Sequence, residues 1–179
     1  MHNNIFNNDF FQIIFNNASE AYAIGFDNKF IECNEAALKL FALSHKEDFI
    51  GKHPADFSPE KQPDGSNSLQ KSNEFLEKAV THGTQKFEWL HKRSTSEEFY
   101  ADVVLTSLKV MEKIFIQVEI RDISEQKNAE LALKESEQRF RTIFENSADA
   151  YMVLYKNRFV DCNSANLALF GFKTKEEFI

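Results

Sequence analysis

The chain has 179 residues, of which 28 are acidic and 21 basic, and its formal charge is −7. This balance argues against a general binder of nucleic acid or anionic membranes, because phosphate neutralisation needs clusters of basic residues. The two cysteines are too few for a disulfide scaffold or a four-cysteine zinc site, and no stretch approaches the ~18 apolar residues of a membrane span. The N-terminus does not have the pattern of a secretory signal, so we expect a cytoplasmic location.

The first predicted element is an amphipathic N-terminal helix, assigned to residues 1–17. Its apolar residues recur at spacings of three and four between Ile5 and Ile14, as on one face of a helix. The remaining positions are rich in asparagine, which is a weak helix former. The pattern still favours a helix with one apolar face.

A short hairpin and two small helices are predicted next. Strands over 20–25 and 29–32 flank a short polar turn. Asn34 is expected to cap a helix over 35–41, because an asparagine side chain can accept a hydrogen bond from the first helical turn. Ser44 is expected to begin a second short helix, in a capping-box sequence.

The middle of the chain is predicted as a loop followed by a longer helix. All three prolines fall within residues 51–65, which favours a structured loop with at most one helical turn. Residues 68–82 have the apolar spacing of a helix, and Gly83 is placed to end it. The acidic residues of the loop do not have the spacing of a calcium site.

Three strands with alternating apolar residues follow, over 84–93, 99–108 and 114–120. Short polar turns at 94–96 and 109–113 predict an antiparallel meander. One face of these strands is expected to point into the core, with Glu88 and Glu119 on the other face. The inward residues are Phe87, Trp89, His91, Phe99, Ala101, Val103, Leu105, Ile114, Ile116, Val118 and Ile120.

A long linker helix is predicted over 124–146, after a capping box formed by Asp122, Ser124 and Glu125. Apolar and small residues occur at alternating steps of four and three, which favours a short coiled-coil seam. The seam consists of Ala129, Leu133, Ser136, Phe140 and Ile143.

The chain contains an internal repeat. Residues 10–50 and 139–179 align without a gap at an offset of 129, with 18 of 41 positions identical. Ten of the 19 phenylalanines are five positions counted twice, and the two cysteines are equivalent positions rather than a bonding pair. The second copy spans only the first third of the first, so we expect a fragment of a longer protein. Its apolar residues should be exposed or covered by a partner: Tyr151, Val153, Phe159, Leu167, Leu169, Phe170 and Phe172.

The order of these elements, with the motifs GKHPADFSPEKQPDG, FEWLHKR and VEIRDISEQKNAE, resembles a PAS domain with its C-terminal PAC motif. One departure is the turn Ser94–Glu97, where the resembling sub-group has Asp-Gly. The resemblance implies an α+β fold: a five-stranded antiparallel sheet with helices on one face, flanked by the N-terminal and linker helices. It also implies a complete domain over 18–123 and the N-terminal third of a second over 147–179.

The resemblance further implies a sensory input module of a two-component or related signalling system. Such a module senses a small ligand or a redox state in its core. It passes the change through the linker helix to an effector outside this chain, either a histidine kinase or a cyclic-dinucleotide enzyme. No catalytic constellation occurs in the sequence, so no enzymatic activity is expected here. The alternative is a ligand-free interaction module, and under either hypothesis the two flanking helices would form a homodimer.

A candidate pocket combines aromatic side chains with a few polar groups. Its expected lining is Asn34, Phe75, Phe87, Trp89, His91, Phe99 and Val118. These residues could equally fill a closed core. The cofactor is unknown: a heme would need His91 as its axial ligand, and the cysteine context of covalent flavin photosensors is absent, which leaves non-covalent flavin open. No metal site is expected.

Signal relay is assigned to Asp122, Ser124 and Glu125, where the last strand meets the linker helix. Asp122 ends the strand and caps the helix, so it is the expected hinge. The alternative for Asp122 is a plain helix cap.

Overall fold

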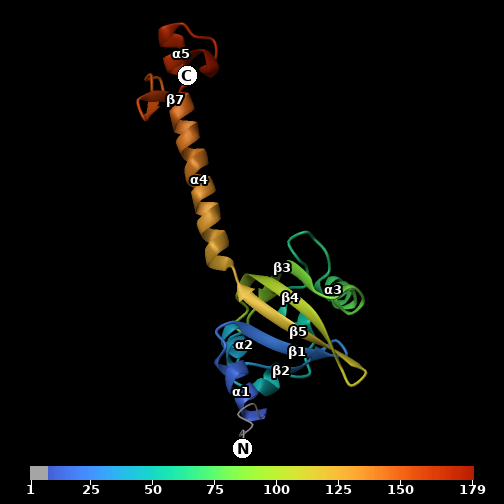
Figure 1. The fold of residues 1–179 in the computed structure, drawn as a ribbon. Coiled ribbons are helices and arrows are strands. Elements are labelled where there is room, and N and C mark those ends of the chain that lie inside the picture. Colours follow the sequence, from blue (N-terminus) through green and yellow to red (C-terminus); the bar gives the residue numbers. More distant parts are fainter. Residues whose placement is uncertain (1–7) are drawn as a thin grey trace, which may run out of the picture. The chain divides into compact units, whose positions relative to one another are not determined.

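A computed structural model describes residues 8–179, which form two compact units, one ending at Glu125 and one spanning Gln126–Ile179 (Figure 1). The first seven residues of the predicted N-terminal helix lie outside the described residues. The first unit contains α1 (Asn8–Asn17), β1 (Ala21–Phe26), β2 (Lys29–Cys33), α2 (Glu35–Leu40), η1 (Lys46–Asp48), η2 (Pro54–Phe57), α3 (Ser68–His82), β3 (Gln85–Lys92), β4 (Glu98–Val110) and β5 (Lys113–Asp122).

The first unit is built on a five-stranded antiparallel sheet of order β2-β1-β5-β4-β3. Its inward side chains meet those of α2, η2 and α3 in one apolar core, so the predicted α+β architecture is confirmed. Trp89, His91 and Phe99 are buried as the strand alternation predicts, and Phe87 is half-buried. Glu88 is exposed, whereas Glu119 is half-buried on the outer face.

Two-residue turns join the tightest hairpins. Asp27 and Asn28 have φ values of 51° and 58°, and Met111 and Glu112 have 45° and 62°. Positive φ at both central residues matches the right-handed twist of paired strands. The predicted five-residue turn at 109–113 was therefore wrong, because β4 and β5 pair as far as Val110 and Lys113.

Three local predictions have different outcomes. Gly83 ends α3 with a φ of 85° and donates its N–H to the Ala79 carbonyl, as predicted. Ser44 does not begin the next helix, because the residue before η1 is His45 and its side chain makes no capping bond. Ile114 was expected in the core but is exposed, since it lies beside the β4–β5 turn.

The second unit repeats the start of the first. The linker helix α4 (Ser124–Asn146) leads into β6 (Met152–Tyr155), β7 (Arg158–Cys162), α5 (Ser164–Phe170) and α6 (Lys175–Phe178). Lys156 and Asn157 again have positive φ, 48° and 60°. Of the seven apolar residues expected to be exposed in this copy, six are exposed and Leu167 is half-buried.

Candidate functional site

A partly open cavity of about 30 Å³ lies between the inner face of the sheet and α3. This volume has room for about one water molecule. Apart from His91 and Ser72, the lining side chains are apolar. The lining consists of Phe30, Pro54, Ser72, Leu76, Phe87, Trp89, His91, Val103, Leu105, Val118 and Ile120.

His91 is the polar side chain that most distinguishes this cavity. Its exposed fraction is 6 %, and its Nδ1 lies 3.1 Å from the Phe57 carbonyl oxygen. Because a carbonyl can only accept, Nδ1 carries the proton and Nε2 holds the lone pair. Nε2 is buried and has no hydrogen-bond partner. Burial lowers the pKa of His91 from 6.5 to about 4, against the opposing effects of the Phe57 carbonyl and Asp122.

The loop between η2 and α3 is hydrogen-bonded to β3 beside the cavity. The Trp89 indole N–H donates to Ser58 Oγ over 2.8 Å. The buried Gln62 amide bonds both backbone groups of Leu90, at 2.9 and 3.1 Å, and Ser68 Oγ at 2.8 Å. These hydrogen bonds were not predicted from the sequence, although the motif SPEKQPDG contains both Ser58 and Gln62.

Four of the seven predicted pocket residues line the cavity, namely Phe87, Trp89, His91 and Val118. Phe75 instead stacks on Phe87 with ring centroids 3.7 Å apart, behind the lining. Phe99 stacks on His91 at 5.4 Å. Both therefore support lining residues rather than the cavity itself.

Asn34 lies in a different part of the fold, where it joins α1, β1 and α2. Its Oδ1 accepts from the backbone N–H groups of Tyr22 and Ala37, at 3.0 and 2.9 Å. Its Nδ2 donates to the carbonyls of Phe15 and Glu20, at 3.1 and 2.9 Å. All four hydrogen-bonding positions of the amide are thus occupied within the protein.

The second copy repeats this network at Asn163. Its Oδ1 accepts from the N–H groups of Tyr151 and Asn166, and its Nδ2 donates to the carbonyls of Phe144 and Asp149. The four distances lie between 2.8 and 3.0 Å. Asn163 therefore holds the C-terminal end of α4 to the segment just before β6 and caps α5, as Asn34 holds α1.

A set of contacts links the cavity to the start of α4. The Phe99 ring, stacked on His91, also contacts the Arg93 guanidinium, whose carbon lies 4.1 Å from the ring centroid. Arg93 pairs with Asp122 at 2.7 Å and donates to the Leu40 carbonyl. Sequence reasoning did not single out Arg93, although it ends the motif FEWLHKR just before the β3–β4 turn.

Two of the three predicted relay residues, Asp122 and Ser124, are in contact here. Asp122 Oδ1 accepts from the backbone N–H of Ser124 at 2.8 Å, and Ser124 Oγ accepts from the Tyr100 N–H at 3.0 Å. Partial burial opposes ionisation of Asp122, but its bonds with Ser124 and Arg93 keep its pKa below the ordinary value. Glu125 is exposed at the first turn of α4.

The residues around the cavity do not fit a heme or a flavin ring as they are packed. Sites for ligands of that size have volumes of roughly 300 Å³ or more, about ten times this cavity. Within residues 8–179, no three His, Cys, Asp or Glu side chains come together as a potential metal site. Burial raises the pKa of the Cys33 thiol to about 11, so this cysteine is not a reactive thiolate.

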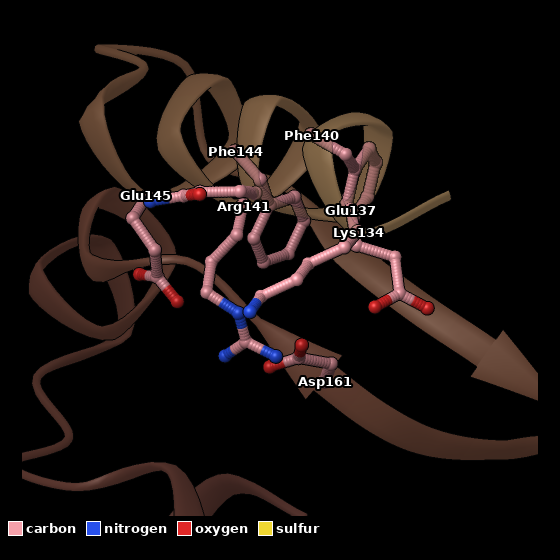
Figure 2. A pocket seen from close by; sticks show the side chains of 8 residues that line it. Lys134, Glu137, Phe140, Arg141, Phe144, Glu145 and Asp161 are labelled. Carbon is pink, nitrogen blue, oxygen red and sulfur yellow. The ribbon is translucent and has the colours of Figure 1, made fainter. Parts of the chain in front are cut away.

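A second cleft, of about 510 Å³, lies in the second unit between α4 and β7 (Figure 2). Lys134 and Arg141 point toward Asp161, with Glu137 and Glu145 nearby (Figure 2). The pKa of Asp161 is lowered, first by its hydrogen bond with Lys175 and further by Arg141. Because charges of both signs line this cleft, it offers no uniform charge to select a ligand. The core cavity is therefore the stronger candidate site.

The sheet order and the helices packed on one face define a small α+β domain. Residues 19–125 match the family described as "PAS domain", and residues 138–179 match a second model of the same description. The chain belongs to the PAS domain family, and its second PAS copy is partial. No helix among the described residues is both long and apolar enough to cross a membrane.

Two curated relatives are kinases of Bacillus subtilis (strain 168). Sporulation kinase A is 23 % identical over 172 residues, covering 96 % of this chain and 27 % of the kinase. Sporulation kinase E is 27 % identical over 170 residues, covering 93 % of this chain and 21 % of the kinase. The chain thus spans about a quarter of the length of these relatives.

Among solved structures, a PAS domain in complex with ethanol has the same fold. It comes from a LuxR-family transcriptional regulator of Burkholderia thailandensis, and its TM-score is 0.53 at 19 % identity. The match covers 64 % of this chain and 97 % of that one. At this identity the likeness establishes the fold alone.

Proposed function

We propose that this chain is a sensory input module in which a small ligand binds the core cavity of the first PAS domain. The observation that carries the proposal is the contact series from the cavity to α4: His91 on Phe99, Phe99 on Arg93, and Arg93 on Asp122. A ligand that displaces His91 would therefore act, through Phe99 and Arg93, on Asp122, which bonds the first residue of α4. The related PAS domain crystallised with ethanol supports a small molecule in such a fold.

Native mass spectrometry of the purified chain tests ligand binding directly. A retained small molecule, or saturable binding from a library of metabolites with a matching change in Trp89 fluorescence, is the expected result. Trp89 is the only tryptophan and lines the cavity, so its emission reports on the site. A chain that binds nothing and keeps its fluorescence unchanged would contradict the sensory proposal.

The domain division that we propose follows this path. The complete domain of residues 18–123 would hold the ligand, the helix of 124–146 would carry the change, and 147–179 would begin the second PAS domain. In the full-length protein the effector would be a kinase, since both curated relatives are kinases. A cyclic-dinucleotide enzyme is the alternative effector, and the chain itself would have no enzymatic activity.

Replacing Arg93 by glutamine is expected to loosen the start of α4. The change removes the partly exposed ion pair between Arg93 and Asp122. We therefore expect the free energy of local opening at the start of α4 to fall by about 1.4 kcal/mol. This corresponds to a tenfold faster amide hydrogen exchange at residues 128–131. Exchange measured by mass spectrometry should show a smaller change at 101–105 in β4. Lys86→Gln breaks the exposed pair with Asp102 and serves as the control without effect on α4.

A second candidate function, dimerisation, is favoured by exposed apolar residues at equivalent places on α1 and α4. Phe11 and Phe140 are 60 and 61 % exposed, and Ile14 and Ile143 are 54 and 65 % exposed. All five residues of the predicted seam on α4 are exposed. A second copy of the chain would cover these faces. In this alternative, the core remains closed and association is the whole function.

The double variant Leu133→Glu/Phe140→Glu is expected to weaken self-association about 100-fold. Two charges placed in an apolar seam would cost about 3 kcal/mol on association. Light scattering across a concentration series measures the effect. Met111→Glu alters a still more exposed apolar residue at the β4–β5 turn and should leave association unchanged. A double variant that associates like the wild type would contradict dimerisation through α4.

A further inference from the structure

The Nε2 atom of His91 is a buried acceptor that the protein leaves unused. Nδ1 donates to the Phe57 carbonyl, so Nε2 holds a lone pair, and it has no hydrogen-bond partner. A buried polar atom without a partner carries the cost of its desolvation, and in native structures such a group calls for an explanation such as a bound water, an ion or a functional role. His91 lines the cavity, and a partner from the cavity meets Nε2 when the side chains between them move apart.

The other walls of the cavity define what else the partner must be. No charged side chain lines it, and Ser72, the other polar residue, already donates its hydroxyl to the Leu69 carbonyl at 3.0 Å. An ion would lose its hydration here without compensation. The surroundings therefore select a neutral molecule that is apolar except where it meets His91.

Space for an apolar part adjoins the cavity. A groove of about 420 Å³ lies beside the β1–β2 turn and α3, and it shares four lining residues with the cavity. These shared residues are Phe30, Pro54, Leu76 and Val118. A molecule whose polar end occupies the cavity would place its apolar body among them.

We propose that the cavity selects small, neutral, largely apolar molecules that carry one hydroxyl or N–H donor, and that His91 Nε2 is the specificity-determining acceptor. This inference rests on the proposed ligand-sensing function and adds its chemical class. The apolar body lies against Leu76 and Val118, and displacement of these side chains admits bodies larger than the resting cavity.

A pair of isomers tests the proposal on the intact chain. Butan-1-ol and diethyl ether have the same molecular formula, but only the alcohol can donate a hydrogen bond to His91. Trp89 fluorescence reports binding of either, and the nitrogen resonance of His91 Nε2 reports a hydrogen bond. We expect butan-1-ol to bind about tenfold more tightly than the ether, because its hydroxyl donates to the otherwise unpartnered acceptor Nε2. Only the alcohol should shift the Nε2 resonance.

His91→Phe should remove the preference between the isomers, and the wild-type comparison decides the matter even where this variant does not fold. Equal binding of both isomers with an unmoved Nε2 resonance would overturn the role of His91 and leave ligand sensing standing. Binding of neither isomer, with Nε2 bonded to a single water, would overturn this inference. The metabolite screen of the purified chain then decides the proposed function separately.

Discussion

Asn34→Ala is expected to lower the free energy of unfolding of the first unit by about 3–4 kcal/mol. The substitution removes the cap of α2, worth about 1 kcal/mol, and leaves three further backbone groups without partners inside the protein. Urea unfolding followed by circular dichroism measures the loss. The effect should be large because Asn34 is fully buried, so water does not replace the lost bonds.

Asn67→Ala is the matched control for this prediction. Asn67 is also a helix N-cap, but it is exposed, and its side chain accepts a single hydrogen bond, from the Gln70 N–H at 3.1 Å. Its loss should cost about 1 kcal/mol. Asn34→Asp tests the two hydrogen bonds that Asn34 Nδ2 donates. The aspartate carboxylate still accepts from Tyr22 and Ala37, but it has no donor for the carbonyl oxygens of Phe15 and Glu20. Equal losses for Asn34→Ala and Asn67→Ala would show that the four-bond network contributes nothing beyond capping.

Acidification from pH 7 to pH 4 is expected to cost about 3 kcal/mol of stability through His91 alone. The unfolded chain takes up a proton at this residue near pH 6.5, whereas the folded chain does so only near pH 4. Between these values the unfolded state binds more protons, so stability falls as the pH falls. Unfolding free energies measured at half-unit intervals of pH should show this slope.

His91→Phe should flatten the stability profile between pH 6.5 and pH 4. His82→Gln changes an exposed histidine at the last turn of α3 and should leave the slope as in the wild type. Asp64 and Asp122 also affect stability, because their partners hold their pKa values below the ordinary 3.8. Their contribution is lost at lower pH, as the pH falls below 3.8. An unchanged slope in His91→Phe would contradict a buried neutral histidine.

Several of the predicted pocket residues could be placed on the inner face of the sheet because strand alternation is a local property. The period of two placed Trp89, His91 and Val118 on the inner face, and all three line the cavity. Asn34 was grouped with them as a polar residue near the core, yet its amide is used up in joining α1, β1 and α2. Arg93 was missed because its partner Asp122 lies 29 residues away, and no local pattern relates the two.

The amino-acid sequence by itself determined the elements of this protein and their duplication. The periods of strands and helices and the prolines of the 51–65 loop are local properties of the sequence. The duplication follows from a direct comparison of residues 10–50 with residues 139–179, at an offset of 129. Only the tertiary structure decided the size of the cavity, the unpartnered nitrogen of His91 and the contact series from Phe99 to Asp122. These features depend on how α3 and the 51–65 loop pack against the sheet. In a close-packed core, small displacements of side chains open or close a cavity of this size.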